Sequence, residues 1–164
     1  MKRLLTRAAA PTLILTLALA VAACGQDDDV TTNPDATESE FAFGSPADAG
    51  DADRVIVIQT TDALTFEPAD ITVAAGETVT FRLSNDGTVV HDFTLGDQAT
   101  QDEHEAEMSE MNGMAHNEPD VVTIPSGETV ELTWTFGDGG SILIGCHQPG
   151  HHAAGMTGQI TVEG

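Results

Sequence analysis

Apolar and polar side chains alternate in short runs from Arg54 to the end of the chain. The clearest runs lie at 79–83, 89–95 and 130–136, and further strands are expected at 55–60, 71–73, 121–124, 141–146 and 159–162. A period of two places successive side chains on opposite faces of a β-strand, so each run predicts a half-buried strand. Turn residues separate the runs. The sequence therefore predicts an all-β fold, an antiparallel Greek-key β-sandwich of about seven or eight strands.

The unit Gly-Glu-Thr-Val occurs twice, at residues 76–79 and 127–130, and each copy opens an alternating run. A glycine followed directly by such a run is typical of a turn that feeds a strand. The repeat supports the all-β interpretation, and at four residues it is too short to indicate a solenoid.

The amino-terminal residues have the composition of an export signal. A cationic start is followed by an apolar run of 16 residues, Ala8–Ala23, whereas a membrane-spanning helix needs about 20. Val21-Ala22-Ala23-Cys24 resembles the lipobox of bacterial lipoproteins. We therefore expect residues 1–23 to be a signal peptide, Cys24 to carry a lipid, and the chain to be anchored on the periplasmic or extracellular face of the cell membrane. An ordinary signal peptide and an uncleaved anchor are the alternatives.

Residues 24–53 are rich in Asp, Ala, Thr, Ser and Pro and poor in large apolar side chains. Such a segment cannot bury enough apolar surface to offset the entropy lost on ordering. We expect it to be a disordered acidic linker between the lipid and a single folded domain at 54–164.

The chain carries a net charge of −22, and after the first seven residues its 27 acidic residues face only Arg54 and Arg82. No basic surface remains to neutralise phosphates, which excludes nucleic-acid binding. An anionic membrane surface would also repel the chain, so we expect membrane contact only through the lipid. The charge either steers a cationic partner or keeps the chain solvated, and its even spread favours solvation.

The chain has two cysteines, Cys24 and Cys146. If Cys24 carries the lipid, no intramolecular disulfide is available to Cys146. Cys146 is then either a small buried side chain or a metal ligand.

Cys146 begins a stretch rich in metal-binding side chains, because His151 and Met156 follow it by five and ten residues. A trigonal site of one Cys and two His with a weak axial Met suits copper in electron transfer. The second imidazole is expected from His91, which shares the core-facing parity of positions 93 and 95. A core histidine is the alternative interpretation of His91.

These motifs, together with Phe66-Glu67-Pro68 and the segment from Asn85 to Phe93, resemble the cupredoxins, in particular plastocyanin/azurin-like small blue copper proteins with auracyanin-type ligand loops. The resemblance covers residues 54–164. It implies that His91, Cys146, His151 and Met156 bind one type 1 copper. Asp92 departs from the pattern, because several relatives have Asn beside the first histidine.

His147 and His152 flank the ligands and are expected to point to solvent, with His147 as a possible electron exit route or outer-shell partner. Gly145 precedes Cys146, so the His-Cys-His bridge of multicopper oxidases and reductases is missing. No acid/base pair is evident either, and we expect a protein that is not an enzyme.

An acidic insertion near residues 97–120 contains His104, Met108, Met111, Met114 and His116. The spacing of the methionines would place three thioethers on one side of a short helix, which suits a second soft site for Cu(I). The alternative is a mobile insertion whose methionines are incidental or pack on the sandwich.

The first functional interpretation is a type 1 copper protein that carries single electrons to or from a redox protein, as a monomer. The alternative is a copper-binding protein for copper resistance, storage or delivery, which would use the Met/His insertion and a copper-handling partner. A structural or adhesive lipoprotein without metal is the third interpretation, and the complete set of ligands argues against it.

Overall fold

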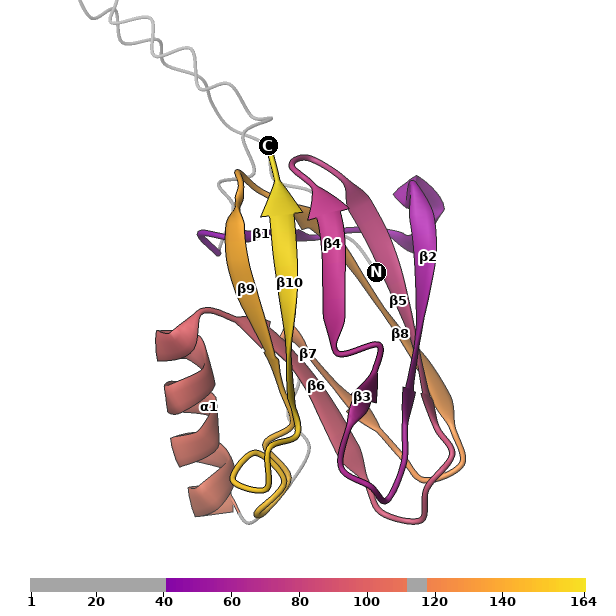
Figure 1. The fold of residues 1–164 in the computed structure, drawn as a ribbon, viewed down its shortest axis with the longest axis vertical. Helices are drawn as coiled ribbons and strands as arrows, with labels where there is room; N and C mark the ends of the chain where they lie inside the picture. Colours follow the sequence, from indigo (N-terminus) through magenta and orange to yellow (C-terminus); the bar gives the residue numbers. More distant parts are fainter. Residues whose placement is uncertain (1–40, 112–117) are drawn as a thin grey trace, which may run out of the picture. The chain divides into compact units, whose positions relative to one another are not determined.

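The computed structural model describes residues 41–111 and 118–164 (Figure 1). Two five-stranded sheets, a 3-10 turn and one helix make up this part of the chain. In chain order the elements are β1 (Gly44–Pro46), the 3-10 turn (Ala49–Asp51), β2 (Arg54–Thr60), β3 (Phe66–Glu67), β4 (Asp70–Ala74), β5 (Thr78–Asn85), β6 (His91–Gly96), α1 (Gln98–Met111), β7 (Val121–Ile124), β8 (Thr129–Phe136), β9 (Gly140–Gly145) and β10 (Thr157–Glu163). The expected signal peptide, Cys24, Met114 and His116 lie outside the described residues.

The strands form a β-sandwich, as the alternating sequence predicts, but its sheets are mixed rather than purely antiparallel. One sheet has the order β1-β8-β5-β2-β3 and the other β4-β10-β9-β6-β7. The β2/β5 and β4/β10 pairs are parallel. The chain leaves the first sheet after β3, adds β4 to the second sheet and returns as β5. This excursion lets β5 run in the same direction as β2.

The core consists of alternate residues from both sheets. Phe93 on β6 contacts Phe66 and Phe81 of the opposite sheet, with ring centroids 5.7 and 5.3 Å apart. Trp134 and Ile144 are likewise fully buried. This apolar layer fixes the strands that carry the metal-binding candidates at one end of the sandwich.

The repeated Gly-Glu-Thr-Val unit forms the same turn twice. Gly76 and Gly127 have φ angles of +76° and +73°, a left-handed conformation that glycine adopts without a steric penalty. In both turns the glutamate N–H donates to a carbonyl three residues earlier, at 3.1 Å. The copies open β5 and β8, which are neighbours in the first sheet.

Every residue of β6 is buried, although the alternating pattern predicts a strand with one exposed face. The second face is covered by α1, which packs on the outside of the second sheet beside β6 and β9 (Figure 1). Asp97 caps this helix, because its carboxylate accepts hydrogen bonds from the N–H and hydroxyl of Thr100 at 3.0 and 3.1 Å. In the part of the chain that the structure describes, the one α-helix has 14 residues and is too short and too polar to span a membrane.

Residues 41–53, which we expected in the disordered linker, belong to the sandwich. Strand β1 pairs with β8, and Ala47 N–H donates to Thr133 O at 3.1 Å. The rings of Phe41 and Phe43 both lie with their centroids 5.2 Å from that of Trp134. The sequence interpretation counted these two phenylalanines as too few apolar side chains to order the segment, because their packing partner Trp134 lies far along the chain.

A chain that begins at residue 54 is expected to be less stable than one that begins at residue 41, by about 2–4 kcal/mol. The shorter chain loses the burial of two half-buried phenylalanines and exposes Trp134. Urea unfolding of the two chains, followed by tryptophan fluorescence, measures the difference. Equal midpoints would show that residues 41–53 contribute nothing, and Phe43→Ala in the longer chain should account for about half of the loss.

Candidate metal centre

Three metal-binding side chains meet at the end of the sandwich where β6 begins and β9 ends. His91 is the first residue of β6, and Cys146 directly follows β9, its neighbour in the sheet. His151 comes from the loop between β9 and β10. His91, Cys146 and His151 each offer one donor atom within 4.8 Å of the others. The structure thus brings together three of the four residues that the sequence predicts as metal ligands.

Two glycine turns shape the loop that carries His151 and Met156. His151 N–H donates to Gln148 O at 2.9 Å around Gly150, whose φ is +83°. Met156 N–H then donates to His151 O at 3.0 Å, and Cys146 N–H donates to Met156 O at 3.2 Å. These backbone bonds return the loop to its starting point and hold it closed. Met156 is fully buried beside Cys146 in the core cluster.

The segment before His91 is held by polar side chains. Asn85 Nδ2 donates to Val89 O at 2.7 Å and to Ile124 O at 3.0 Å, and its Oδ1 accepts from Gly87 N–H at 3.0 Å. The Asp62 carboxylate accepts hydrogen bonds from the backbone N–H groups of Thr88 and Val89 and from the Thr88 hydroxyl. These bonds lower the pKa of Asp62. The backbone that leads into His91 is thus held in place by the side chains of Asn85 and Asp62.

The donor atoms face one another at distances that suit a metal ion. Cys146 Sγ lies 3.3 Å from His151 Nδ1 and 4.0 Å from His91 Nδ1. A metal with bonds of about 2.0 Å to nitrogen and 2.3 Å to sulfur separates these donors by about 3.6–3.8 Å. His91 Nδ1 and His151 Nδ1 both face the sulfur of Cys146. The three donor atoms therefore fit the metal ion that the sequence implies.

Burial sets the protonation of these side chains in the metal-free protein. It raises the pKa of the Cys146 thiol to about 12, although hydrogen bonds from backbone N–H groups of Asp92 and Gln148 oppose the change. Burial also lowers the pKa of His91, with repulsion from His151 as the next cause, and it lowers the pKa of His151. At neutral pH the metal-free site thus holds a thiol and two neutral imidazoles.

Residues 52–163 match the copper binding proteins of the plastocyanin/azurin family. The chain belongs to this family. Copper is therefore its metal, and the chemistry of the His, Cys and Met donors agrees with that assignment.

Individual relatives support the same family. The chain is 39% identical over 127 residues to the copper-resistant cuproprotein CopI of Rubrivivax gelatinosus, which covers 77% of each protein. It is also 39% identical over 151 residues to the CopI protein of Pseudomonas aeruginosa, covering 74% of this chain and 83% of that protein. A solved structure of auracyanin B superposes with a TM-score of 0.62 at 20% identity, over 74% of this chain and 97% of auracyanin B, and supports the fold alone.

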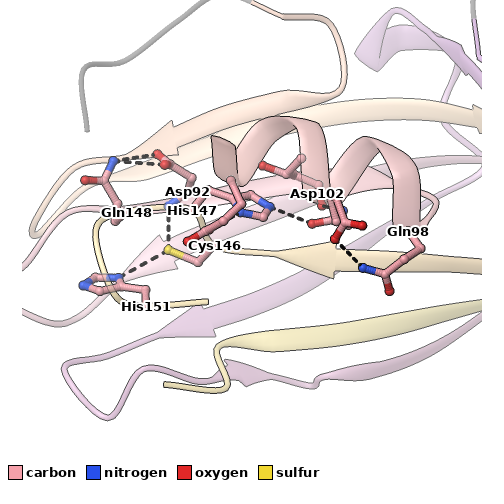
Figure 2. Close-up of polar contacts among 10 residues, drawn as sticks. Asp92, Gln98, Asp102, Cys146, His147, Gln148 and His151 are labelled. Carbon is pink, nitrogen blue, oxygen red and sulfur yellow. Dashed lines mark hydrogen bonds and ion pairs between the residues drawn. The ribbon is translucent and has the colours of Figure 1, made fainter. Parts of the chain in front are cut away.

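Asp92, where the family resemblance leads us to expect Asn, is buried beside Cys146. Its backbone N–H donates to Cys146 Sγ at 3.3 Å. Its two carboxylate oxygens accept from Gln148 Nε2 at 3.1 and 3.0 Å (Figure 2). The backbone contact to the sulfur is thus kept, and the side chain adds a carboxylate. The sequence interpretation missed Gln148, which no spacing pattern distinguishes.

His147 does not point to solvent, as the sequence led us to expect. Its side chain is fully buried against α1, where its two ring nitrogens lie within hydrogen-bonding distance of Glu105 and Gln101. Burial lowers the pKa of His147. His152 is half-buried, and its ring stacks on that of His147 with centroids 4.7 Å apart. The expectation failed because it took no account of a helix over this face.

The Met/His insertion forms α1 up to Met111. Met108 is buried against the sandwich, as the packing interpretation predicts, and His104 is buried with its Nδ1 3.3 Å from Glu118 Oε2. One donor atom from each of His104, Glu107 and Glu118 lies within 4.8 Å of the other two, which is close enough for the three side chains to hold an ion. The soft site expected from all five residues stays a prediction, because Met114 and His116 lie outside the described residues.

Proposed function

We propose that this chain is a copper-resistance protein that holds one copper ion in a type 1 site. The ligands are His91, Cys146 and His151, with Met156 as the weak fourth ligand. The observation that carries the proposal is the convergence of both Nδ1 atoms on a buried Cys146 Sγ. Thiolate and thioether donors favour Cu(I), while imidazole accepts both oxidation states. The relatives named copper-resistant cuproproteins support the physiological role.

The residues of the site would bind and shield the ion. The Asp92 N–H stabilises the negative charge of the Cys146 thiolate. The closed loop from Cys146 to Met156 keeps water from the sulfur, which is completely buried. A bound ion is thus withheld from other cellular thiols, which is what copper resistance requires.

Copper tolerance tests this role. In the source organism, deletion of the gene should reduce growth in excess copper, and the wild-type gene should restore it. Cys146→Ser should fail to restore growth at equal protein levels. Full restoration by Cys146→Ser would contradict a role of this site in resistance.

A second candidate function is the transfer of single electrons to a redox partner. It is favoured by the geometry of the site, because the donors already face one another without metal. A site that moves little between oxidation states exchanges electrons with little reorganisation. If this is the main role, Cys146→Ser abolishes electron transfer to the partner while copper tolerance persists.

Asp92→Asn is expected to raise the reduction potential of the bound copper by about 40–90 mV. The carboxylate favours Cu(II) over Cu(I), and removing its charge at an effective dielectric constant of about 20 changes that preference by about 1–2 kcal/mol. Gln148 can still donate to the new amide oxygen. Spectroelectrochemical titration measures the shift. Asp138→Asn, in an exposed turn at the other end of β9, is the matched control and should leave the potential unchanged.

We also propose that the protein is exported and anchored through Cys24. The amino-terminal sequence alone supports this step. Mass spectrometry of the membrane fraction should find a mature protein that begins with a lipid-modified Cys24, and Cys24→Ala should abolish the modification. A soluble mature protein cut at another residue would contradict the proposal.

A further inference from the structure

A second group of metal-binding side chains lies beside the copper site, on the face covered by α1. It consists of Glu105 on the helix and of His147 and His152 on the ligand loop, whose donor atoms all lie within 4.8 Å of one another. None of the three is a ligand in the proposed copper site. The group therefore needs its own explanation.

The hydrogen bonds around His147 decide which of its ring nitrogens carries a hydrogen. Gln101 Nε2 points at two backbone carbonyls, Thr94 O at 3.2 Å and Leu143 O at 3.4 Å, which fixes the orientation of the amide. Gln101 Oε1 must then face His147 Nε2, at 2.7 Å. Because an amide oxygen only accepts, the hydrogen of the imidazole is on Nε2.

The opposite nitrogen therefore directs a lone pair at a carboxylate. His147 Nδ1 lies 2.8 Å from Glu105 Oε2, and in a neutral imidazole both atoms are acceptors. Two acceptors at this distance repel each other unless a positive centre lies between or beside them. A hydrogen on Nδ1 would make the buried ring a cation, whereas a metal ion would bind both atoms.

Gly145 makes this arrangement possible. A Cβ at this position would overlap Gln101 Oε1 and would lie 2.8 Å from His147 Nε2. Any other residue would displace the amide that orients the imidazole. The absence of a side chain at this position leaves room for the hydrogen bond from His147 Nε2 to Gln101, which directs His147 Nδ1 toward Glu105. Metal-binding histidines are usually oriented in this way, by a hydrogen bond from the second ring nitrogen.

The site is open to solvent on one side. The His147 side chain is fully buried, while that of Glu105 is 41% exposed and His152 is half-buried. The rings of His147 and His152 are stacked at 24°, so the imidazole of the loop residue His152 would turn to bring a nitrogen to an ion held by Glu105 and His147. Water can complete its coordination on the open side.

We infer that Glu105, His147 and His152 bind a second divalent ion, Cu(II), in addition to the copper held by Cys146. Two imidazoles and a carboxylate form a borderline site without sulfur, which suits Cu(II) rather than Cu(I). Among the divalent ions of the first transition series, Cu(II) also binds such donors most strongly. The inference goes beyond the proposed function and uses residues that the first site does not use.

Copper counting tests the inference. The purified full chain is dialysed against buffered Cu(II), and bound copper is measured by mass spectrometry together with the visible and paramagnetic resonance spectra. We expect one more ion in the wild type than in Glu105→Gln or His152→Ala, and the extra ion should give the signal of tetragonal Cu(II). The affinity for this ion should fall at least about 10-fold in both variants, since loss of an outer-shell partner already costs this much.

Glu105→Gln keeps the shape of the side chain, and its amide can donate to the free lone pair of His147 Nδ1. The variant should therefore remain folded, with an unchanged thiolate-to-copper absorption band. Glu110→Gln is the matched control, because it makes the same carboxylate-to-amide change at an exposed position of α1 outside the group and should retain the extra ion. Equal copper content in the wild type, Glu105→Gln and His152→Ala would overturn the inference, as would loss of the ion in Glu110→Gln alone. If the Cys146 site does not bind copper, the thiolate-to-copper absorption band should be absent from the wild type and from all variants. This result differs from loss of the second ion alone.

Discussion

Cys146→Ser is expected to lower the affinity of the first site for copper by more than about 100-fold and to remove the visible absorption that a thiolate bound to Cu(II) produces. Loss of an outer-shell partner of a metal ligand already costs about 10–100-fold, and here the ligand itself is lost. A serine hydroxyl is a hard, protonated donor that binds copper poorly. Competition with a chelator measures the affinity, and the visible spectrum reports the thiolate.

The substitution is structurally mild, because serine is close in size to cysteine and can accept the hydrogen bond from Asp92 N–H. The fold should persist, which thermal unfolding of the metal-free proteins will show. Cys24→Ser is the matched control: it removes the other cysteine and should leave copper binding unchanged. An unaltered spectrum in Cys146→Ser would exclude the proposed site.

The apparent affinity for copper is expected to rise about tenfold for each pH unit between pH 7 and pH 9. Over this range the metal-free thiol is protonated, because its pKa is raised to about 12. The bound form is a thiolate, so binding releases one proton and each added pH unit favours binding by that factor. His91 and His151 contribute nothing in this range, because their lowered pKa values leave both rings already neutral.

At acidic pH the dependence should become steeper, since each imidazole must then lose a proton before it binds the metal. Chelator competition at several pH values, with proton release followed by an indicator dye, measures both regimes. In Cys146→Ser the slope between pH 7 and pH 9 should disappear. A flat profile in the wild type would mean that no buried thiol is deprotonated on binding.

The part of the metal centre that was predictable from sequence is local. The spacing from Cys146 to Met156 fits a closed loop because two glycine turns and three backbone bonds are encoded within that stretch. His91 was predictable because parity on a strand determines which side chains face the core. Cys146, at the end of the neighbouring strand β9, needed no separate argument, because the family resemblance already assigned it to the same site as His91.

The environment of His147 was not predictable in this way. It depends on α1, whose Glu105 lies 42 residues before His147 in the chain, and on the orientation of Gln101. A search for helical spacing would have placed Gln101 and Glu105 on one helix face, four residues apart, but not over the ligand loop. In the same way, strand β1 was missed because it is held by pairing with β8 and by the packing of the preceding Phe41 and Phe43 on Trp134, all far along the chain.

Anomalous diffraction at the copper absorption edge, from crystals of the copper-loaded protein, locates the metal without any assumption about its ligands. We expect a peak within bonding distance of Cys146 Sγ and of the Nδ1 atoms of His91 and His151, with Met156 as the fourth neighbour. Copper bound only elsewhere, with these donors left as they stand in the metal-free fold, would contradict the proposed site and the function built on it.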